Sequence, residues 1–176
     1  MIKIIALSDT HLDSDLPRDL AELAQDADLI MHAGDFTSVD IYNLLRDLGK
    51  VEAVWGNADP SEIRALLPKR KVVEVEGIKV GLVHRASHSP GPLGPGILAR
   101  EMEVDVLVYG HLHKPYVERG DKLLICPGSP IVPRMSPPTV AEIEIDGRRV
   151  SGRIVPLGKP TCDYLVYAAS LSKNDQ

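Results

Sequence analysis

The chain has 176 residues, a length that fits one domain whose core needs neither a disulfide nor a structural metal. A hydrophobic content of 44% argues against a disordered protein, and a net charge of -5 without a basic block argues against stable nucleic-acid binding. Two cysteines, a short apolar N-terminal run and no membrane-length apolar run predict a cytoplasmic protein that does not bind membranes.

The first third of the chain alternates between two kinds of hydrophobic pattern. Short apolar strands are expected at 2–8, 28–34 and 51–56, and helices at 17–27, at 38–50 and from residue 61 onward. Pro17 suits the first position of a helix, Ser38 suits an N-cap, and Gly49 suits a helix stop. Strands that alternate with helices predict parallel pairing with right-handed crossovers.

The remainder of the chain changes to hairpin patterns. Turns are expected at Gly77, at Gly120-Asp121 and at Asp146-Gly147. The segment 84–96 is rich in glycine and proline and is expected to be one long surface loop. Together the two halves predict an α/β fold with two packed mixed β-sheets flanked by helices. We expect a single domain over 1–165 and a C-terminal tail over 166–176.

Seven side chains that can bind a metal follow the ends of five predicted core strands. They are Asp9, His11, Asp35, Asn57, His84, His111 and His113. Because ligands of parallel α/β sheets bind beyond the carboxyl ends of the strands, we expect these side chains along one edge. The set exceeds what one tetrahedral zinc needs, and it suits two divalent cations that share a carboxylate. Imidazole-rich ligation favours manganese, iron, zinc, nickel or cobalt over magnesium or calcium.

The surroundings of these residues suit a phosphoryl group. Gly34, Gly56 and Gly110 stand beside predicted ligands and leave room for metal and substrate. Two divalent cations, two aspartates and one hydroxide sum to a net charge of about +1. Such a site favours a singly charged phosphodiester over a doubly charged monoester.

The residue blocks that carry these ligands resemble a known family. The blocks are Asp9-Thr10-His11, Gly34-Asp35, Gly56-Asn57, His84 and Gly110–His113. Together they resemble the calcineurin-like metallophosphoesterase superfamily, most closely its small single-domain phosphodiesterase branch, which includes a related retromer subunit. The segment CPGSPIVPR at 126–134 resembles the closing motif of that branch, so the similarity extends to about residue 155.

The resemblance implies a four-layer α/β/β/α sandwich and a metal-dependent hydrolase, a phosphodiesterase or phosphatase. A hydroxide that bridges two divalent metals would attack phosphorus in a small phosphorylated substrate, with manganese as the favoured metal and nickel, zinc, iron or cobalt as alternatives. The first metal would be held by Asp9, His11 and His113, the second by Asn57, His84 and His111, and Asp35 would bridge them. Asp35, Asn57 and His84 would act in catalysis. Whether the chain forms a homo-oligomer stays open.

Two positions differ from the family pattern. Ala58 stands where many members have histidine or cysteine, so this position offers no proton to the leaving group. General acid help is typically worth about 10²–10⁴-fold, which predicts a slow enzyme or one that needs good leaving groups. Arg85 stands where a glycine is usual and either binds a phosphate or obstructs it. Arg85 and His88 are the candidate substrate-binding residues, with a solvent-facing side chain as the alternative for His88.

Two other functions stay open. A non-catalytic scaffold that binds a partner would keep the fold and lose ligands, yet all seven ligands are present. A single-metal binding module would hold one metal per chain. His32, which lies inside the second predicted strand, is expected to be a hydrogen-bonded core histidine rather than a catalytic residue.

Overall fold

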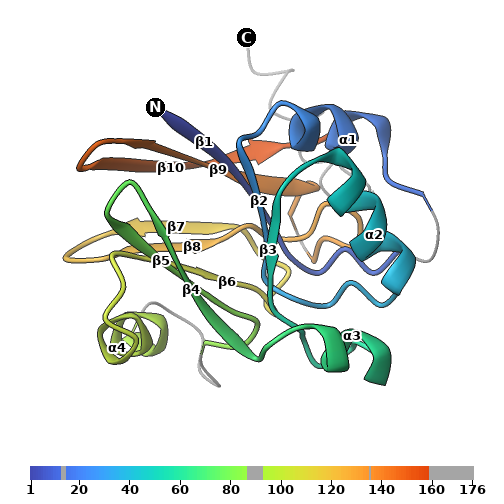
Figure 1. Ribbon diagram of the computed structural model, residues 1–176, viewed down its shortest axis with the longest axis horizontal. Helices are drawn as coiled ribbons and strands as arrows, with labels where there is room; N and C mark the ends of the chain where they lie inside the picture. The colour runs from blue at the N-terminus through green and yellow to red at the C-terminus, as the bar shows by residue number, and fades with distance from the viewer. Residues whose placement is uncertain (13–14, 87–92, 135, 159–176) are drawn as a thin grey trace, which may run out of the picture.

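The computed structural model describes residues 1–12, 15–86, 93–134 and 136–158, and within them ten strands form two five-stranded sheets (Figure 1). The first sheet has the order β10-β9-β1-β2-β3, with β1 (Ile2–Leu7), β2 (Leu29–His32), β3 (Val51–Ala53), β9 (Thr139–Asp146) and β10 (Arg149–Pro156). The second has the order β4-β5-β6-β8-β7, with β4 (Arg70–Val75), β5 (Ile78–Val83), β6 (Val106–Tyr109), β7 (Tyr116–Arg119) and β8 (Leu123–Cys126).

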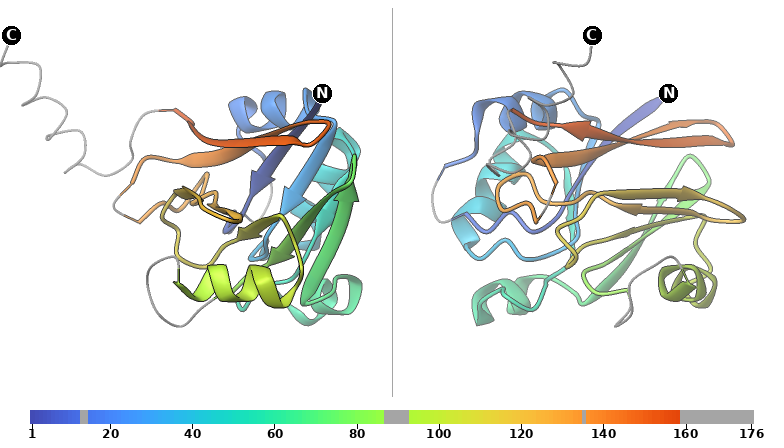
Figure 2. Two further views of the ribbon diagram at one scale, coloured as in Figure 1. Left: turned by 90° about the vertical axis from the view of Figure 1, so that its left-hand side faces the viewer. Right: turned by 180° about the vertical axis from the view of Figure 1, so that it is seen from behind.

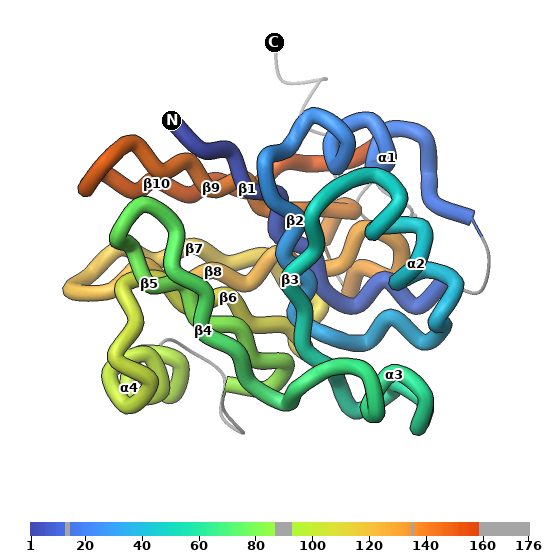
Figure 3. Tube along the Cα trace, viewed as in Figure 1, coloured from blue at the N-terminus to red at the C-terminus, as the bar shows by residue number. Residues whose placement is uncertain are grey.

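Both sheets are mixed, as the sequence predicted. Strands β1, β2 and β3 are parallel, and so are β5, β6 and β8. The antiparallel pairs are β1 with β9, β9 with β10, β4 with β5, and β7 with β8. In the Cα trace, the β9–β10 hairpin lies beside β1 although more than 130 residues separate them (Figure 3).

Among the described residues, four helices cover the outer faces of the sheets: α1 (Arg18–Gln25), α2 (Val39–Leu48), α3 (Ser61–Leu66) and α4 (Leu93–Glu101). Alternation along β1 explains the layers. Ile4 and Ala6 pack between the two sheets, whereas Ile5 and Leu7 pack against the helix side with Leu20 of α1. Helix α4 covers the second sheet from the other side (Figure 2). The four-layer α/β/β/α sandwich is therefore confirmed.

Strand direction gives the sandwich two distinct ends. The three predicted hairpin turns are confirmed at Glu76-Gly77, at Gly120-Asp121 and after Asp146, and they lie on the left in Figure 1. We call this the hairpin end. Because β1, β5 and β8 start there and β2, β3 and β6 run parallel to them, the carboxyl ends of all six strands lie at the opposite end. We call that the site end.

The predicted surface loop over 84–96 was wrong at its last four residues, because α4 begins at Leu93. Pro95 lies in the first turn of this helix, where backbone N–H groups have no partner inside the helix, so proline removes no hydrogen bond. Burial of Leu98 and Ala99 against the second sheet stabilises the helix. Residues 87–92, including His88, and the predicted tail at 166–176 lie outside the described residues.

The predicted helix ends hold to within a few residues. Ser38 is the N-cap of α2, and its hydroxyl accepts a hydrogen bond from the Asp40 N–H at 3.1 Å, while Gly49 ends the helix. Pro17 lies one position earlier than predicted, at the N-cap of α1. In the described part of the chain, every helix is too short or too polar to cross a membrane.

Candidate metal centre

The site end brings together two groups of acidic and histidine side chains. The first group is Asp9, His11 and His113, and one ligand atom from each lies within 4.8 Å of the others. The second group is Asp9, Asp35 and His84, with the same spacing. Asp9 and His11 follow β1, Asp35 follows β2, His84 follows β5, and His113 comes from the loop after β6. These five donors come from four of the five strand ends that the sequence analysis named.

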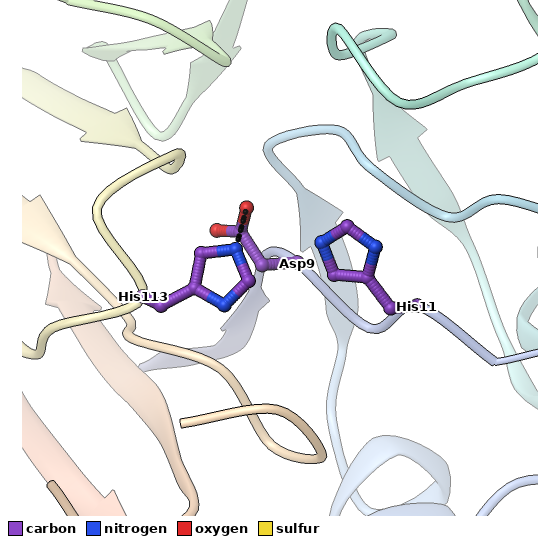
Figure 4. A group of neighbouring side chains, drawn as sticks. All are labelled: Asp9, His11 and His113. Atoms are coloured by element: carbon purple, nitrogen blue, oxygen red, sulfur yellow. Dashed lines mark ion pairs between the residues drawn. The ribbon is translucent and has the colours of Figure 1, made fainter. Parts of the chain in front are cut away.

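The first group has the arrangement of a metal site (Figure 4). The Nδ1 of His113 donates to the Val132 carbonyl at 2.7 Å, which leaves Nε2 to face Asp9 Oδ1 at 3.2 Å. Such a backbone contact orients the ring of a metal-binding histidine. In the described part of the chain, the buried Asp9 Oδ1 and His11 Nε2 have no hydrogen-bond partner. Buried polar atoms without partners are rare, and a cation between these two would satisfy both.

The second group centres on Asp35 and His84. Nδ1 of His84 donates to the Ala33 carbonyl at 2.8 Å, and Nε2 lies 3.3 Å from Asp35 Oδ2 and 3.0 Å from Asn57 Oδ1. Asp35 Oδ2 also lies 3.7 Å from His11 Nε2. Asp35 therefore contacts a histidine from each predicted metal position, which is what a bridging carboxylate requires.

His111 belongs to neither group of three. Its ring centre lies 5.3 Å from that of His84, in an edge-to-face arrangement. Its backbone N–H donates to Asp9 Oδ2 at 3.0 Å, so the residue also helps to hold Asp9. Six of the seven predicted ligands thus lie close to one another through polar side-chain atoms or stacked rings, and His111 joins them through the edge of its ring against His84.

The backbone is strained where it carries the predicted ligands. Five of the seven have a positive φ: Asp9 (55°), His11 (44°), Asp35 (63°), His111 (75°) and His113 (54°). Residues other than glycine seldom adopt this left-handed conformation, which costs about 1–3 kcal/mol each and is concentrated at functional sites. Part of this cost is offset by backbone hydrogen bonds, such as that from Asp9 N–H to the Gly34 carbonyl at 3.0 Å.

Glycines at the site end make room for the donors, as predicted. A Cβ added at Gly56 would lie 2.2 Å from Asp35 Oδ1 and 2.8 Å from His84 Cγ. A Cβ at Gly110 would lie 2.8 Å from Ser8 Cβ and 3.0 Å from Asp9 Oδ2. The close approach of the ligand loops therefore requires glycine at both positions.

Asp59 is a site residue to which the sequence analysis gave no role. Its side chain is 3% exposed and accepts three backbone hydrogen bonds. Oδ2 accepts from Gly56 at 2.7 Å and from Asp35 at 2.9 Å, and Oδ1 accepts from Thr37 at 2.9 Å. Asp59 thereby ties the Asp35 loop to the Asn57 loop. The sequence feature that could have identified this role is an aspartate in a glycine-containing loop, because such aspartates often accept hydrogen bonds from backbone N–H groups.

The carboxylates and imidazoles change one another's proton affinity. The Asp9 carboxylate, whose Oδ1 lies 3.2 Å from His113 Nε2, raises the pKa of His113. Burial would lower the pKa of His84, but the hydrogen bond and charge of Asp35 outweigh it, and the pKa is raised. Burial would raise the pKa of Asp35, but the contact with His84 and the hydrogen bond from the Ala58 N–H outweigh this effect and keep the pKa below its ordinary value. Because metal ligands must be deprotonated, binding of a cation would displace protons from these histidines.

His32 is a core histidine, as expected. Its side chain is fully buried, its ring stacks on Phe36 with centres 3.6 Å apart, and Nδ1 accepts from the Gly34 N–H at 3.1 Å. Nε2 lies 3.3 Å from Thr10 Oγ1. Burial lowers the pKa of His32 to about 3, so the ring is neutral near neutral pH.

Arg85, a predicted substrate-binding residue, is exposed and lies on the wall of a cavity of about 450 Å³. Asn57 and His84 line the same cavity, so it opens directly beside the second group.

Comparisons with known proteins cover most of the chain. Residues 2–148 match the calcineurin-like phosphoesterase superfamily domain. The chain is 38% identical over 164 residues to a probable metallophosphoesterase of Methanothermobacter thermautotrophicus, an alignment that covers 90% of this chain and 95% of that protein. Vps29 of Entamoeba histolytica complexed with Zn²⁺ has a TM-score of 0.72 at 20% identity, covering 88% of this chain and 99% of that one. A novel archaeal phosphodiesterase has a TM-score of 0.71 at 23% identity, covering 88% and 100%.

Proposed function

Because the chain belongs to the calcineurin-like phosphoesterase superfamily, we propose that it is a phosphodiesterase that uses two divalent cations to hydrolyse a small phosphorylated substrate. One observation carries the proposal: two groups of three metal-capable side chains share Asp9 at the strand ends. The orphaned buried atoms Asp9 Oδ1 and His11 Nε2 support it, because a cation would satisfy both.

The donors fit the proposed pair of cations. The first would be held by Asp9, His11 and His113, and the second by Asn57, His84 and His111. Asp9 is common to both groups and Asp35 contacts both His11 and His84, so either carboxylate can be the shared one. The imidazole-rich set supports manganese, with nickel, zinc, iron or cobalt as alternatives.

When bound, two such cations supply Lewis-acid polarisation of the phosphoryl oxygens and a hydroxide nucleophile at neutral pH. The residues of the chain contribute positioning. The Ala33 and Val132 carbonyls fix the rings of His84 and His113 with Nε2 toward the centre. Ala58 has no proton to give, so water must protonate the leaving group at this position. We therefore expect the best rates on esters of acidic alcohols.

Charge supports a diester over a monoester. The sequence-based sum of about +1 left out Asp59, whose buried carboxylate lies against the Asp35 and Gly56 N–H groups. Including it brings the sum to about zero, so a singly charged diester leaves one excess negative charge at the centre and a doubly charged monoester leaves two.

The test combines metal analysis with a pair of chromogenic esters. Protein purified without chelator is expected to contain two metals per chain and, with added manganese, to cleave bis(p-nitrophenyl) phosphate faster than p-nitrophenyl phosphate. His113→Ala is expected to lose both metal and activity, whereas Arg148→Ala at the hairpin end retains them. One metal per chain would reject the paired site, and equal rates or a monoester advantage would reject the diester preference.

A second candidate is a catalytically weak or inactive scaffold that binds a protein partner. Its support is the similarity in fold to Vps29, together with Ala58 and Arg85, which depart from the family pattern. Metal-loaded protein that hydrolyses neither ester would favour the scaffold. Hydrolysis that His113→Ala abolishes would exclude it as the sole function.

A further inference from the structure

We propose that the cavity beside Asn57 and His84 binds a second anionic group of the substrate, and that the substrate is a phosphodiester carrying an additional phosphate. The inference rests on the proposed phosphodiesterase function and specifies the class of compound that this site hydrolyses. It is carried by the residues that line the cavity and by its position next to the centre.

The walls of the cavity concentrate positive charge. Among the described residues that line it are three cationic side chains, Lys69, Arg70 and Arg85, and no carboxylate. The chain as a whole carries 25 acidic and 20 basic residues, so a wall with only basic charges departs from its average surface. A cleft lined by one sign of charge focuses the field and attracts ligands of the opposite sign.

Two of these cations are available to a ligand. Arg70 forms an ion pair with Glu101 at 3.2 Å and is therefore partly neutralised. Lys69 and Arg85 take part in none of the ion pairs formed by the described residues, and both are exposed. A guanidinium can hold a phosphate through two parallel hydrogen bonds, and an ammonium adds a point charge. Together they suit one phosphate group.

The position of the cavity connects it to the reaction. Asn57 and His84 line it, and these same side chains meet at 3.0 Å beside Asp35. A substrate whose scissile phosphorus lies at the centre therefore extends one of its ester groups into the cavity. The volume of about 450 Å³ accommodates that group together with a phosphate.

Trp55 provides a flat wall and a built-in reporter of binding. Lys69 Nζ lies 5.9 Å from the centre of the Trp55 ring system, and Arg64 Cζ lies 5.1 Å from it. Arg64 also donates to the carbonyls of Asn57 and Asp59 at 2.8 Å, which anchors this side of the wall. Trp55 is the single tryptophan of the chain, so all of the tryptophan fluorescence comes from this wall of the cavity.

A matched pair of substrates tests the proposal by hydrolysis. The p-nitrophenyl ester of thymidine 5′-phosphate is compared with the same ester bearing a 3′-phosphate. We expect kcat/KM to be about 10-fold higher for the 3′-phosphorylated ester, the gain from one well-placed charged contact. In the double variant Lys69→Met, Arg85→Gln this ratio is expected to fall to about one, whereas Arg148→Gln keeps it. A wild-type ratio near one, or a ratio that survives the double variant, would overturn the proposal.

A binding measurement separates this inference from the proposed function. Protein purified without chelator is titrated with thymidine 3′,5′-bisphosphate and with thymidine 5′-phosphate while the fluorescence of Trp55 is followed. We expect the bisphosphate to bind at least about 10-fold more tightly, and the double variant to lose that difference. Equal affinities would overturn the inference even if the enzyme is active. Preferential binding without hydrolysis of any ester would retain the cavity assignment and reject the phosphodiesterase function.

Discussion

Glycine serves different purposes at the two ends of the sandwich. At the hairpin end, Gly77 and Gly147 have positive φ values of 81° and 57°, and an added Cβ would meet nothing within 4 Å. At the site end, Gly56 and Gly110 lack that conformation, yet an added Cβ would lie within 3 Å of neighbouring atoms. The hairpin turns use Gly77 and Gly147 to avoid backbone strain, whereas the site uses Gly56 and Gly110 to bring loops together.

Left-handed residues other than glycine lie mostly at the site end, although the turn residue Glu76 is one at the hairpin end. Asp9, Asp35 and His113 have left-handed backbones although they are not glycine, because their side chains are needed as donors. The site end therefore tolerates backbone strain because the strained residues place donor side chains. Substitutions that alter donor spacing should therefore impair function at the site end, and matched substitutions at the hairpin end should affect stability alone.

The largest effect is expected for alanine at Gly56. The new methyl group would overlap Asp35 Oδ1 and press on His84, displacing both donors. A misplacement of about 1 Å can cost about 10²-fold in rate, so we expect hydrolysis with added manganese to fall at least about 100-fold. Elemental analysis should show less bound metal. The matched change Gly147→Ala should lower the free energy of unfolding by about 1 kcal/mol and leave the rate unchanged. A fully active Gly56→Ala enzyme would contradict the packing argument.

The next effect concerns Asp59, which holds two site loops together. Asp59→Ala leaves three backbone N–H groups without their acceptor, and we expect the free energy of unfolding to fall by about 3 kcal/mol or more, with loss of bound metal. Asp59→Asn keeps an oxygen that can accept from two of the three N–H groups, so the free energy of unfolding should fall by about half as much. Urea unfolding and elemental analysis measure both. The exposed Asp146 at the hairpin end is the control, because Asp146→Ala should change stability by less than about 0.5 kcal/mol. Equal behaviour of Asp59→Ala and Asp146→Ala would contradict the assignment.

The next effect is a pH dependence of the free energy of unfolding that comes from His32, which lies beneath the site loops. Its expected size is similar to that of Asp59→Ala or smaller. The pKa of His32 is about 3 in the folded protein and 6.5 in the unfolded chain, so the unfolded state binds a proton first as the pH falls. The stability from the neutral ring is therefore complete above the unfolded pKa and is lost progressively below it. Between pH 7 and pH 4.5 this loss amounts to about 2–3 kcal/mol. His32→Asn removes the titrating group, so its stability deficit relative to wild type should shrink by that amount at the lower pH. A deficit that does not change with pH would contradict a neutral, buried His32.

Some features of the fold and of the candidate site could be predicted from the sequence, and others could not. The hairpin turns were predictable because a dipeptide with glycine between apolar strands is a local signal, and the gathering of candidate donors at one end was predictable because each follows a predicted strand. The role of Asp59 was not, since two of its N–H partners, Asp35 and Thr37, lie 24 and 22 residues away. The start of α4 was also missed, because glycine and proline are equally compatible with a loop and with a first helical turn. Sharing of Asp9 by the two groups depends on side-chain distances that no pattern encodes.

The smallest effect is an expected gain at the hairpin end. Strands β4 and β5 are joined by the two-residue turn Glu76-Gly77, in which both residues have a positive φ. Turns of this kind favour Asn-Gly, because asparagine tolerates the left-handed conformation better than glutamate. We expect Glu76→Asn to raise the free energy of unfolding by about 0.5–1 kcal/mol. The substitution also removes the exposed hydrogen bond that Glu76 accepts from the Gly147 N–H at 3.3 Å, and the loss of this weak contact reduces the gain slightly. Glu74→Asn, two residues earlier in β4, is the control and should not stabilise, since asparagine is disfavoured within strands.

The same variant tests whether the two ends are independent. The turn lies at the end of β5 opposite His84, so Glu76→Asn should leave the metal content and the hydrolysis rate at wild-type values. Urea unfolding, elemental analysis and the diester assay on one preparation measure all three quantities. A gain in stability accompanied by loss of metal would mean that strain in the turn is coupled through β5 to the donors. In that case the strained backbone of the site could not be treated as a local property of its loops.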